Sequence, residues 1–420
     1  MMEILLMLRQ PLFPPDTGGK VRSLNIFSRL AKRASIDAVS FADRATETEG
    51  IWSMKRMFRS YIAVPWDEAP KNSIRFYLEV LANQISPLPY TLAKCNRPEF
   101  QSAVKALTSR NGYDVVLCDF LHTAVPLLPI PYRPKVIFEH NVEFQLRKRR
   151  WELEAHWLRR WILGNEWRKT RAAEAKVCRS LDHVICVSSE DAQTLRSEFG
   201  IDSVSVLPTG VDTDYFRPSG TGAQRGRMVF VGSMDWDPNE DGVVWFLEEI
   251  YPRIRQEIPE AGFYIVGRNP SARLRRVADA NPGVVVTGRV GDVRPYLAAS
   301  EIVVVPLRVG GGTRIKIPEA MAMAKPVVST SIGAEGLPFQ NGRELCIADQ
   351  PEEFARTVLR LFDNDRLRES INAAARTSVV EKHGWDVVAD SMEAILKQVI
   401  RDAAAPSSRG VQPAARQRMA

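Results

Sequence analysis

The chain has 420 residues, a length that predicts two or three domains or two large lobes. It carries 57 Lys and Arg against 50 Asp and Glu, a formal charge of +7, and it is 45% hydrophobic. This composition excludes a disordered chain, a collagen and a small disulfide scaffold. The five cysteines and five histidines show no metal-binding spacing, so we expect no metal site.

Neither a membrane span nor a secretion signal is visible. No apolar run approaches the roughly 18 residues that a spanning helix needs. The apolar segment 4–8 is too short for the core of a signal peptide, and Glu3 precedes it where a basic residue is typical. We therefore expect a cytoplasmic protein. Residues 403–420 contain three Arg, no acid and much Ala, Pro and Ser, which predicts a disordered tail.

Short apolar runs alternate with longer amphipathic stretches along the chain. The expected strands are 3–8, 37–41, 114–118, 135–139, 183–187, 203–207, 228–231, 263–266, 284–286, 302–305 and 326–329. The expected helices include 19–33, 240–256, 313–324 and 352–362. Runs that are apolar throughout are typical of strands buried on both faces of a parallel sheet. The alternation occurs twice, which predicts an α/β protein with two doubly wound, Rossmann-like parallel-sheet lobes facing a cleft.

The boundary between the lobes is marked by composition. Residues 217–227 have almost no apolar side chains and predict a linker. It separates an N-terminal lobe, 1–216, from a C-terminal lobe, 228–384. We expect segment 385–402 to form a helix that packs back on the N-terminal lobe. Two such sheets place a ligand cleft between the carboxyl ends of their strands.

The segment 144–179 is the most basic part of the chain. It holds eleven Lys and Arg against four Glu, together with four tryptophans. One interpretation is a long helix across the first lobe, with its tryptophans in the core and its arginines solvated. The other is a basic face that docks on anionic lipid headgroups, extended by segment 52–66. Neither segment has a base-reading motif, so we expect no nucleic-acid partner.

Two expected strands are followed by residues suited to a ligand. Gly18 and Gly19 stand where the first strand turns into a helix, a place where the backbone can approach a phosphate closely. His140 follows strand 135–139 and therefore lies at a carboxyl end, facing the cleft. Glycine pairs are also common in plain turns, and a lone histidine is often structural, so both interpretations remain open.

The strongest stretch lies between residues 306 and 322. A buried strand is followed by three glycines, and a helix is expected to begin at about Thr313, a good N-cap. Arg314 and Lys316 in its first turn suit the phosphates of a nucleoside diphosphate, and Glu319, three residues further on, suits ribose hydroxyls. The stretch is not a P-loop, and no GxGxxG follows the first strand, which disfavours a dinucleotide dehydrogenase.

These segments together resemble the retaining glycosyltransferases of family four, which have the two-lobed GT-B fold. The resemblance spans roughly residues 1–400, and the pattern is similar to that of sugar transferases of exopolysaccharide clusters. It is carried most clearly by segments 207–212, 230–236, 266–267, 287–290, 310–322 and 325–328, and more loosely by 14–19, 138–143 and 188–192.

The resemblance implies a role for each matching residue. Gly18 and Gly19 would contact the donor diphosphate, His140 the transferred sugar, and Val290 the nucleobase through its backbone. Arg314 and Lys316 would hold the pyrophosphate, and Glu319 the ribose. The remaining members of the implied donor-binding set are Gly232, Gly310, Gly311, Gly312 and Thr313.

Two departures from the family pattern stand out. Family members often pair Glu319 with a glutamate eight residues earlier, where this chain has Gly311. The usual Arg and Lys after the strand that ends before Gly232 are replaced by Ser233 and Asn239. We infer that Arg314 supplies the missing charge. The missing sugar contacts come from glycine amides, or the donor differs.

The sequence thus predicts a glycosyltransferase of the retaining type. It would move a sugar from a nucleoside-diphosphate sugar to a glycan or lipid-linked acceptor in exopolysaccharide or cell-envelope glycan synthesis. We expect no cofactor, no metal requirement, and peripheral attachment to an anionic membrane surface at its inner face. The alternatives are a nucleotide-sugar 2-epimerase of the same fold and an inactive nucleotide-binding partner subunit.

Overall fold

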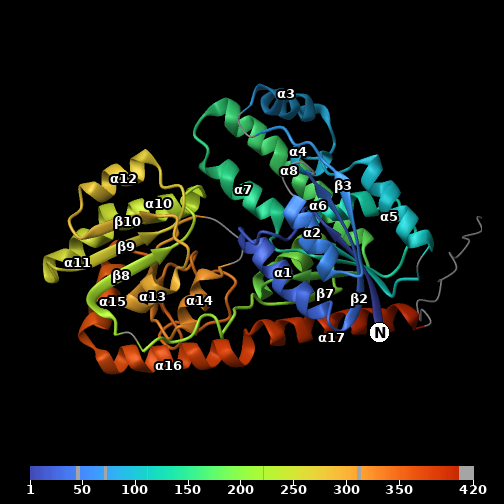
Figure 1. The fold of residues 1–420 in the computed structure, drawn as a ribbon. Helices are drawn as coiled ribbons and strands as arrows, with labels where there is room; N and C mark the ends of the chain where they lie inside the picture. Colours follow the sequence, from blue (N-terminus) through green and yellow to red (C-terminus); the bar gives the residue numbers. More distant parts are fainter. Residues whose placement is uncertain (44–47, 71–72, 111, 221, 310–313, 406–420) are drawn as a thin grey trace, which may run out of the picture.

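The computed structural model describes residues 1–43, 48–70, 73–110, 112–220, 222–309 and 314–405. Two α/β lobes lie side by side, and each is built on one parallel sheet with helices on both faces (Figure 1). This arrangement confirms the predicted fold class.

The N-terminal lobe contains a seven-stranded sheet of order β3-β2-β1-β4-β5-β6-β7. Its strands are β1 (Met2–Leu8), β2 (Ala34–Ala42), β3 (Ser60–Pro65), β4 (Val115–Asp119), β5 (Lys135–Phe138), β6 (His183–Cys186) and β7 (Val204–Val206). Its helices are α1 (Gly18–Leu30), α2 (Thr48–Met57), α3 (Ile74–Ala82), η1 (Asn83–Ile85), α4 (Tyr90–Ala93), α5 (Pro98–Arg110), α6 (Leu121–Ala124), η2 (Val125–Leu127), α7 (Glu143–Leu153), α8 (Trp157–Ser180) and α9 (Ser189–Phe199).

The C-terminal lobe contains a six-stranded sheet of order β10-β9-β8-β11-β12-β13. Its strands are β8 (Gln224–Val231), β9 (Gly262–Val266), β10 (Val284–Gly288), β11 (Ser300–Val305), β12 (Val327–Ser329) and β13 (Cys346–Ile347). Its helices are α10 (Asp237–Trp245), η3 (Phe246–Ile250), α11 (Tyr251–Glu257), α12 (Ala272–Asp279), α13 (Arg294–Ala299), α14 (Lys316–Ala322), α15 (Pro351–Asp363) and α16 (Asp365–Lys382), and α17 (Trp385–Ala404) follows.

Each sheet reverses its strand order beside its first strand. β1 pairs with β2 on one side and with β4 on the other, and β8 pairs in the same way with β9 and β11. All these pairings are parallel, so the strands of one lobe end at the same edge. Loops that leave neighbouring strands at such a switch point diverge and leave a crevice for a ligand.

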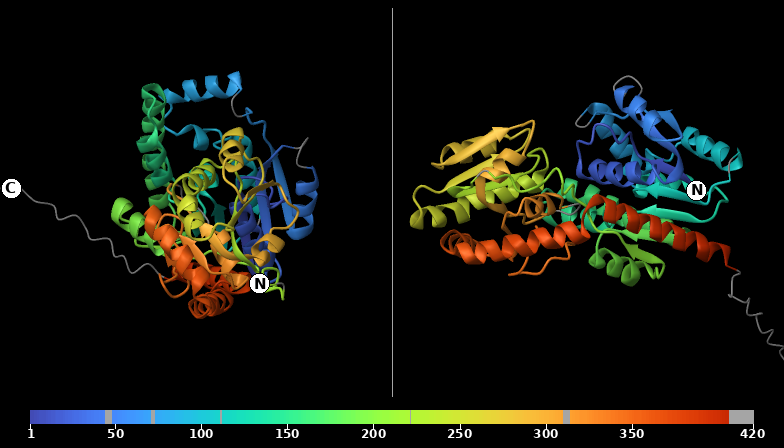
Figure 2. Two further views of the ribbon diagram at one scale, coloured as in Figure 1. Left: turned by 90° about the vertical axis from the view of Figure 1, so that its left-hand side faces the viewer. Right: turned by 60° about the horizontal axis from the view of Figure 1, so that its bottom comes forward.

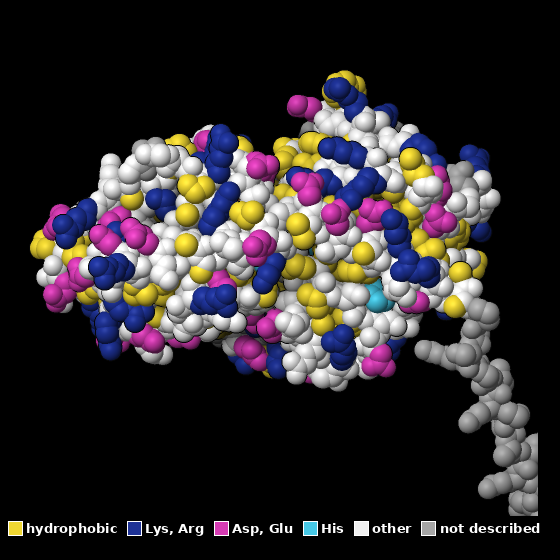
Figure 3. All heavy atoms as spheres, turned by 90° about the horizontal axis from the view of Figure 1, so that it is seen from below, with side chains coloured by type: hydrophobic (Ala, Val, Ile, Leu, Met, Phe, Trp, Pro, Cys, Tyr) yellow, Lys and Arg dark blue, Asp and Glu magenta, His cyan; other side chains and the backbone are white. Residues whose placement is uncertain are grey.

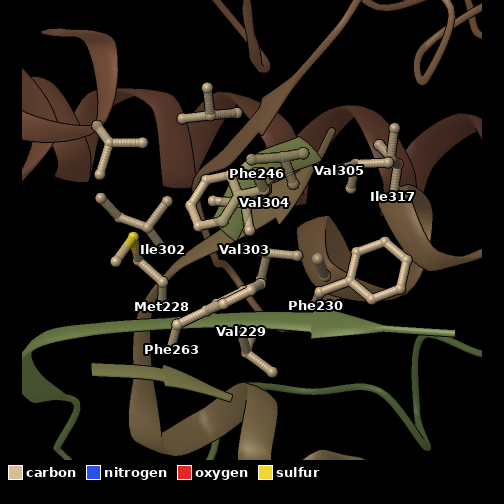
Figure 4. Packing of buried hydrophobic residues seen from close by; sticks show 14 of the residues in the cluster. Met228, Val229, Phe230, Phe246, Phe263, Ile302, Val303, Val304, Val305 and Ile317 are labelled. Atoms are coloured by element: carbon tan, nitrogen blue, oxygen red, sulfur yellow. The ribbon is translucent and has the colours of Figure 1, made fainter. Parts of the chain in front are cut away.

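The sheets are held by apolar side chains on both faces. In the C-terminal lobe the consecutive residues 302–305 of β11 are all buried, which explains why this strand reads as an unbroken apolar run. Figure 4 shows these residues packed with Phe230, Phe246 and Phe263. The rings of Phe246 and Phe263 lie 4.6 Å apart. Buried strands of this kind fix the loops that follow them.

The last helix returns the chain to the first lobe. α16 runs beneath the C-terminal lobe and α17 beneath the N-terminal lobe (Figures 1 and 2). The apolar side of α17, including Met392 and Leu396, is buried in the core that contains Ile26 and Phe27 of α1. Arg29 of α1 also forms an ion pair of 2.7 Å with Asp386. The N-terminal lobe is therefore completed by the end of the chain.

Several predicted boundaries differ from the structure. β8 begins at Gln224, inside the predicted linker 217–227, because backbone pairing with β9 and β11 needs no apolar side chains at the strand start. The guanidinium carbon of Arg227 lies 3.5 Å from the ring centroid of Tyr264 and covers this end. β3 and β13 were not predicted. The expected helix 240–256 is divided by η3, and its first turn begins at residue 237.

The basic segment 144–179 is not one helix. α7 and α8 are joined at residues 154–156, where the backbone of Glu154 and His156 is extended. Trp151 stacks on Trp167 with ring centroids 4.9 Å apart, but the side chains of Trp157 and Trp161 are 75% and 57% exposed. The interpretation that places all four tryptophans in the core is therefore wrong.

Figure 3 shows the side beneath α16 and α17, where acidic and basic side chains are interspersed over both lobes. Among the described residues, no helix has both the length and the apolar character needed to cross a membrane. The tail predicted at 403–420 lies mainly outside the described residues.

The packing of α17 leads to a test of stability. Met392→Ala removes a fully buried side chain from the shared core and should lower the free energy of unfolding by about 2–5 kcal/mol. Gln398→Ala, on the exposed side of the same helix, is the matched control and should change it by less than about 0.5 kcal/mol. Denaturant unfolding measures both, and equal effects would contradict the described contact.

Candidate active site

His140, the histidine predicted at a strand end, is buried and hydrogen-bonded. His140 follows β5 by two residues and is 1% exposed, and its Nε2 lies 2.7 Å from Oδ1 of Asp119, the last residue of β4. A carboxylate only accepts, so Nε2 donates and Nδ1 is left as an acceptor. Nδ1 is buried and has no partner among the described residues. Burial lowers the pKa of His140, which keeps the ring neutral.

Phe120 holds this ring in place. It stacks on His140 with ring centroids 3.8 Å apart and planes 10° from parallel. Its backbone φ is +70°, a value that non-glycine residues rarely adopt. Gly19 lies against the other edge of the same ring, because a Cβ at this position would come within 2.6 Å of Phe120 Cζ. The glycine predicted to admit a phosphate thus also admits an aromatic ring.

These residues line a cavity of about 260 Å³, which we call the histidine cavity. It is bounded by the segment after β1, the first turn of α1, and the ends of β4 and β5. Thr17 caps α1 through its side chain, which accepts from the backbone N–H of Lys20, and both residues line the cavity. Gly18 is the first residue of α1. The cavity therefore lies at the topological switch point of the first sheet.

In the C-terminal lobe, Lys316 and Asn239 meet beside the loop that follows β8, the first strand of the second sheet. Lys316 Nζ donates to Asn239 Oδ1 at 2.8 Å and lies 4.1 Å from the ring centroid of Phe230. A Cβ at Gly232 would come within 2.8 Å of this ammonium, so the glycine makes room for it. Lys316 thus reaches the loop where the family pattern expects a lysine and this chain has Asn239.

Burial is the main cause of the pKa shifts of Lys316 and Glu319. Burial, together with the nearby charge of Arg314, lowers the pKa of Lys316 to about 7. It also raises the pKa of Glu319, which lies on the same helix, to about 8. Both shifts favour the neutral forms. A ligand that brings negative charge to the lysine would reverse its shift.

Arg314 is placed differently from the prediction. It precedes α14, which begins at Lys316, rather than lying in the first helical turn, and it is 4% exposed. Its Nη2 donates to the carbonyl of Ile332 at 2.9 Å and lies 3.9 Å from Glu335 Oε2. Burial lowers its pKa to about 10, so it remains charged at neutral pH. Lys316 and Arg314 therefore contact different segments.

Arg314 lines a second cavity, of about 150 Å³, which we call the inter-lobe cavity. Most of its lining comes from the N-terminal lobe, including Arg22 of α1 and the first residues of α7 and α9. The C-terminal lobe contributes Arg314 and residues 335–337. Arg149 of α7 forms a two-point ion pair with Glu335 across the lobes, at 2.5 and 2.8 Å. Asn141 lines both cavities.

The loop that carries His140 and Asn141 is fixed from below by α8. Glu174 accepts hydrogen bonds from the backbone N–H groups of Glu143 and Phe144, both at 2.8 Å. These N–H groups, at the start of α7, have no partner within the helix. Burial raises the pKa of Glu174 and raises that of neighbouring Glu139 to about 8. The two carboxyl groups lie in the same poorly hydrated environment, where the charge of one would disfavour the charge of the other.

The remaining predicted residues are placed as follows. Val290 follows β10 and is half-buried, with its side chain against the C-terminal core. Gly310, Gly311, Gly312 and Thr313 lie outside the described residues. No group of three or more His, Cys, Asp and Glu side chains in the described ranges could hold a metal ion.

Sequence reasoning missed several residues of this edge. Asp119 and Phe120 directly follow a buried strand, the same signal that identified His140, but the strand was expected to end at residue 118. Arg22 and Asn141 were not singled out as ligand-binding residues. A basic side chain three residues after a glycine pair, and an amide next to His140, were the available signals.

The fold and this edge define the chain as a two-lobed glycosyltransferase of the GT-B type. Residues 225–364 match the family described as glycosyl transferases group 1, and residues 54–215 match glycosyltransferase family 4. The two matches support a glycosyltransferase similar to those of family four, as the sequence predicted.

Relatives and solved structures agree with this assignment. An uncharacterised 44.6 kDa protein in the cps region of Klebsiella pneumoniae is 22% identical over 63% of this chain and 69% of its own length. A GDP-mannose-dependent alpha-(1-6)-phosphatidylinositol monomannoside mannosyltransferase of Mycobacterium tuberculosis is 27% identical over 51% of this chain. The match spans 62% of that enzyme, less than two thirds of its length.

Two solved structures show the shared fold over nearly the whole chain. A sucrose-phosphate synthase from Thermosynechococcus elongatus has a TM-score of 0.72 and 16% identity, covering 96% of this chain and 100% of that one. HepE from Anabaena, in complex with UDP-glucose, has a TM-score of 0.65 and 15% identity, covering 95% of this chain and 100% of that one.

The contact between Gly19 and Phe120 leads to a second test. Gly19→Ala places a methyl group against the ring that stacks on His140, and should lower the free energy of unfolding by about 1–3 kcal/mol. Gly291→Ala is the control, because no atom lies within 4 Å of a Cβ there. Thermal unfolding of the two variants compares them. A normal melting temperature for Gly19→Ala would show that the ring is not held as described.

Proposed function

We propose that the protein transfers a sugar from a nucleoside-diphosphate sugar to a glycan or lipid-linked acceptor with retention of configuration. The observation that carries the proposal is the half-buried ammonium of Lys316, which lies 2.8 Å from Oδ1 of Asn239 in α10 and has Glu319 on its own helix. A cation whose pKa is lowered by burial is suited to an anionic partner, and the diphosphate of the donor supplies one.

The sugar of the donor would lie toward the histidine cavity. Nδ1 of His140 is an acceptor for a sugar hydroxyl, and Asp119 keeps the ring in that tautomer. Gly19 brings the start of α1 to the same cavity. The C-terminal residues would thus hold the nucleoside diphosphate, with Glu319 at the ribose, while the N-terminal residues orient the transferred sugar.

In the proposed reaction, the bond from the anomeric carbon to the diphosphate oxygen breaks. The acceptor hydroxyl attacks from the same face, and its proton passes to the leaving phosphate. Negative charge then grows on the phosphate oxygens. Lys316 in its charged form, together with Arg314, would stabilise that charge in a poorly hydrated place, where fixed charges act most strongly.

The comparisons favour this activity over the alternatives. Both matching families are described as glycosyltransferases, and neither a nucleotide-sugar 2-epimerase nor an inactive partner subunit is among the relatives given above. The position of one relative in a cps region supports a role in exopolysaccharide or cell-envelope glycan synthesis. The printed donors differ, GDP-mannose for one relative and UDP-glucose for one structure, so both belong in a first assay.

Lys316 provides the direct test of the donor site. Lys316→Ala should lower kcat by about 10²–10³, by analogy with the loss of one preorganised donor. Its melting temperature should stay near that of the parent, because the half-buried ammonium contributes little to packing. Lys105→Ala, on the exposed side of α5, is the matched control. Transfer within threefold of the parent rate would remove Lys316 from the site.

The same residue predicts a pH dependence. Its lowered pKa of about 7 means that the ammonium is charged below that pH and neutral above it. Affinity for a nucleoside diphosphate should therefore fall as pH rises from 6 to 8.5. Lys316→Arg should flatten this fall, since a guanidinium stays protonated. Identical pH profiles for the two proteins would assign the dependence to another group.

Chelation tests the proposed source of charge. Because Lys316 and Arg314 would meet the charge of the leaving phosphate, turnover should survive excess EDTA. Loss of turnover with EDTA and its recovery with Mg²⁺ or Mn²⁺ would show that a metal ion is required instead.

An apolar surface on the N-terminal lobe supports peripheral attachment to a membrane. We call it the apolar tip; its exposed members on α3 and η1 are Ile74, Tyr77, Leu78, Leu81 and Ile85, and those on α7 and α8 are Leu153, Trp157, Leu158 and Trp161. The two parts lie together at the top of the lobe in Figure 1, and Lys169 of α8 donates to the carbonyls of Asn83 and Gln84 in η1.

The occupant that this surface fits is an anionic bilayer. Ile85 is 96% exposed, and large side chains this exposed are stabilised when they leave water. Arg150, Arg159 and Arg160 are exposed around the tip and would meet anionic headgroups. An attached enzyme would reach a lipid-linked acceptor directly. The segment 52–66 forms α2 and β3, and only Trp52 is exposed among its aromatic residues.

Liposome sedimentation tests the apolar tip. The protein should bind vesicles with anionic lipid, bind neutral vesicles weakly, and dissociate at high salt. The double variant Trp157→Gln, Trp161→Gln should lower the bound fraction at least about tenfold, because both side chains insert at the headgroup boundary. Val387→Gln on α17, on the opposite side of the molecule, should bind normally. Equal recovery in the supernatant with both lipids would contradict membrane attachment.

A further inference from the structure

The inter-lobe cavity contains a buried charge that the proposed donor site does not use. The side chain of Arg22 is 0% exposed, and its Nη2 donates to Thr209 Oγ1. Its Nε and Nη1 have no partner among the described residues. Nε carries one N–H group and Nη1 carries two.

A guanidinium in this state is costly without a partner. Removing a charge from water costs several kcal/mol unless an opposite charge or hydrogen bonds compensate for it. Asp119 and Asp191 attract Arg22 through space, but neither forms an ion pair with it in the described structure. Asp119 is already bonded to His140 and Ser23. The pKa of Arg22 is lowered by burial to about 9, so its guanidinium stays charged at neutral pH.

The other charged groups of the cavity do not remove this imbalance. Glu335 is shared by Arg149 and Arg314, so the C-terminal contribution carries its own pairing. Asp191 lines the cavity, and burial raises its pKa to about 6. Glu190 also lines it but is exposed to solvent. Among the described residues of the cavity, Arg22 is therefore a cation that is fully buried and has two nitrogens without a hydrogen-bond partner.

The geometry points to a subsite for a negatively charged group, a carboxylate or a phosphate, on the acceptor sugar. Either group would accept a charge-assisted hydrogen bond from Nε or from Nη1 of the guanidinium. The inference rests on the proposed function, since it concerns the acceptor of the same reaction.

The position of the cavity favours the acceptor over the donor. Of the described residues that would hold the donor, Arg314 reaches the boundary of this cavity, but Lys316, Glu319 and Gly232 do not line it. Asn141 lines both this cavity and the histidine cavity, and its Oδ1 is buried without a partner among the described residues. An acceptor sugar whose reacting hydroxyl enters the histidine cavity can thus donate to Asn141 and place an acidic substituent beside Arg22.

Calorimetry on the full chain tests this subsite. The protein is first titrated with UDP and with GDP, and the nucleotide that binds is then kept saturating. D-glucuronate, inorganic phosphate and neutral D-glucose are the probes. At least one of the two anions should bind at least about tenfold more tightly than glucose, which corresponds to one charge-assisted contact.

Two variants connect the binding to Arg22. Arg22→Gln should reduce anion affinity to the level of glucose while leaving nucleotide affinity unchanged. Arg29→Gln, which removes the same charge from another side of α1, is the matched control and should bind the anions normally. The melting temperature of Arg22→Gln should stay within a few degrees of the parent, because the lost desolvation cost offsets the lost bond to Thr209.

A second variant covers the case in which Arg22→Gln does not fold. Asn141→Asp places a carboxylate in the same cavity with almost no change in volume. It should raise the melting temperature and weaken anion binding, because it adds a negative charge to the cavity that Arg22 lines.

The outcomes separate the sources of the anion. Binding of glucuronate alone identifies an acidic sugar, and binding of phosphate alone identifies a phosphorylated acceptor. Displacement of the anions by the nucleotide would overturn the inference, because Arg22 would then serve the donor. So would glucose binding as tightly as the anions, or Arg22→Gln binding them normally. If neither nucleotide binds at all, the proposed function itself fails.

Discussion

Parallel pairing of every strand in both sheets is the constraint on which this structure depends. Parallel strands of one lobe end at a common edge, so each segment that follows a strand is brought to that edge. The sheets also reverse beside β1 and β8, where departing loops diverge. Gly19 and His140 reach one crevice by this rule, and Gly232 and Lys316 reach the other. The site is thus a consequence of the strand order, to which the loops add their chemistry.

The loops contribute charge in places where water is scarce. Lys316, Glu319 and Arg22 all have pKa values shifted toward their neutral forms by burial. Such shifts reduce stability in the absence of a ligand, and core packing such as that around β11 must offset them. The same groups gain most from an opposite charge, because the surroundings screen it weakly. Selection for stability alone would have replaced them with apolar side chains.

The fold could be predicted further than the site. Apolar runs such as 302–305 identify central strands because both faces of a parallel sheet are buried. The edge strand β3 was missed although residues 61–64 are all apolar, and β13 was missed because it has only two residues. The break between α7 and α8 has neither Gly nor Pro to mark it, so 144–179 read as one helix.

The site was only partly predictable for a related reason. A histidine or glycine directly after a strand can be placed at the sheet edge from sequence, since the edge follows from strand polarity. Which side chains meet there depends on rotamers and on distant segments. Lys316 meets Asn239, which is 77 residues away, and Arg314 turns toward Ile332 and Glu335. A one-dimensional pattern does not show these distant partners, although the two cations are only two residues apart.

Arg22 also touches the point where the chain leaves the first lobe. Its hydrogen-bond partner, Thr209, accepts through its backbone carbonyl from Nδ1 of His383 at 3.1 Å. The next residue, Gly210, lies so close to Trp385 that a Cβ would come within 2.3 Å of its ring. The outgoing segment is therefore clamped between α1 and the start of α17. Arg22, the side chain inferred to bind a ligand at the lobe interface, is thus held where the outgoing segment meets the start of α17. Its position relative to the two lobes is fixed by these connecting segments as well as by packing.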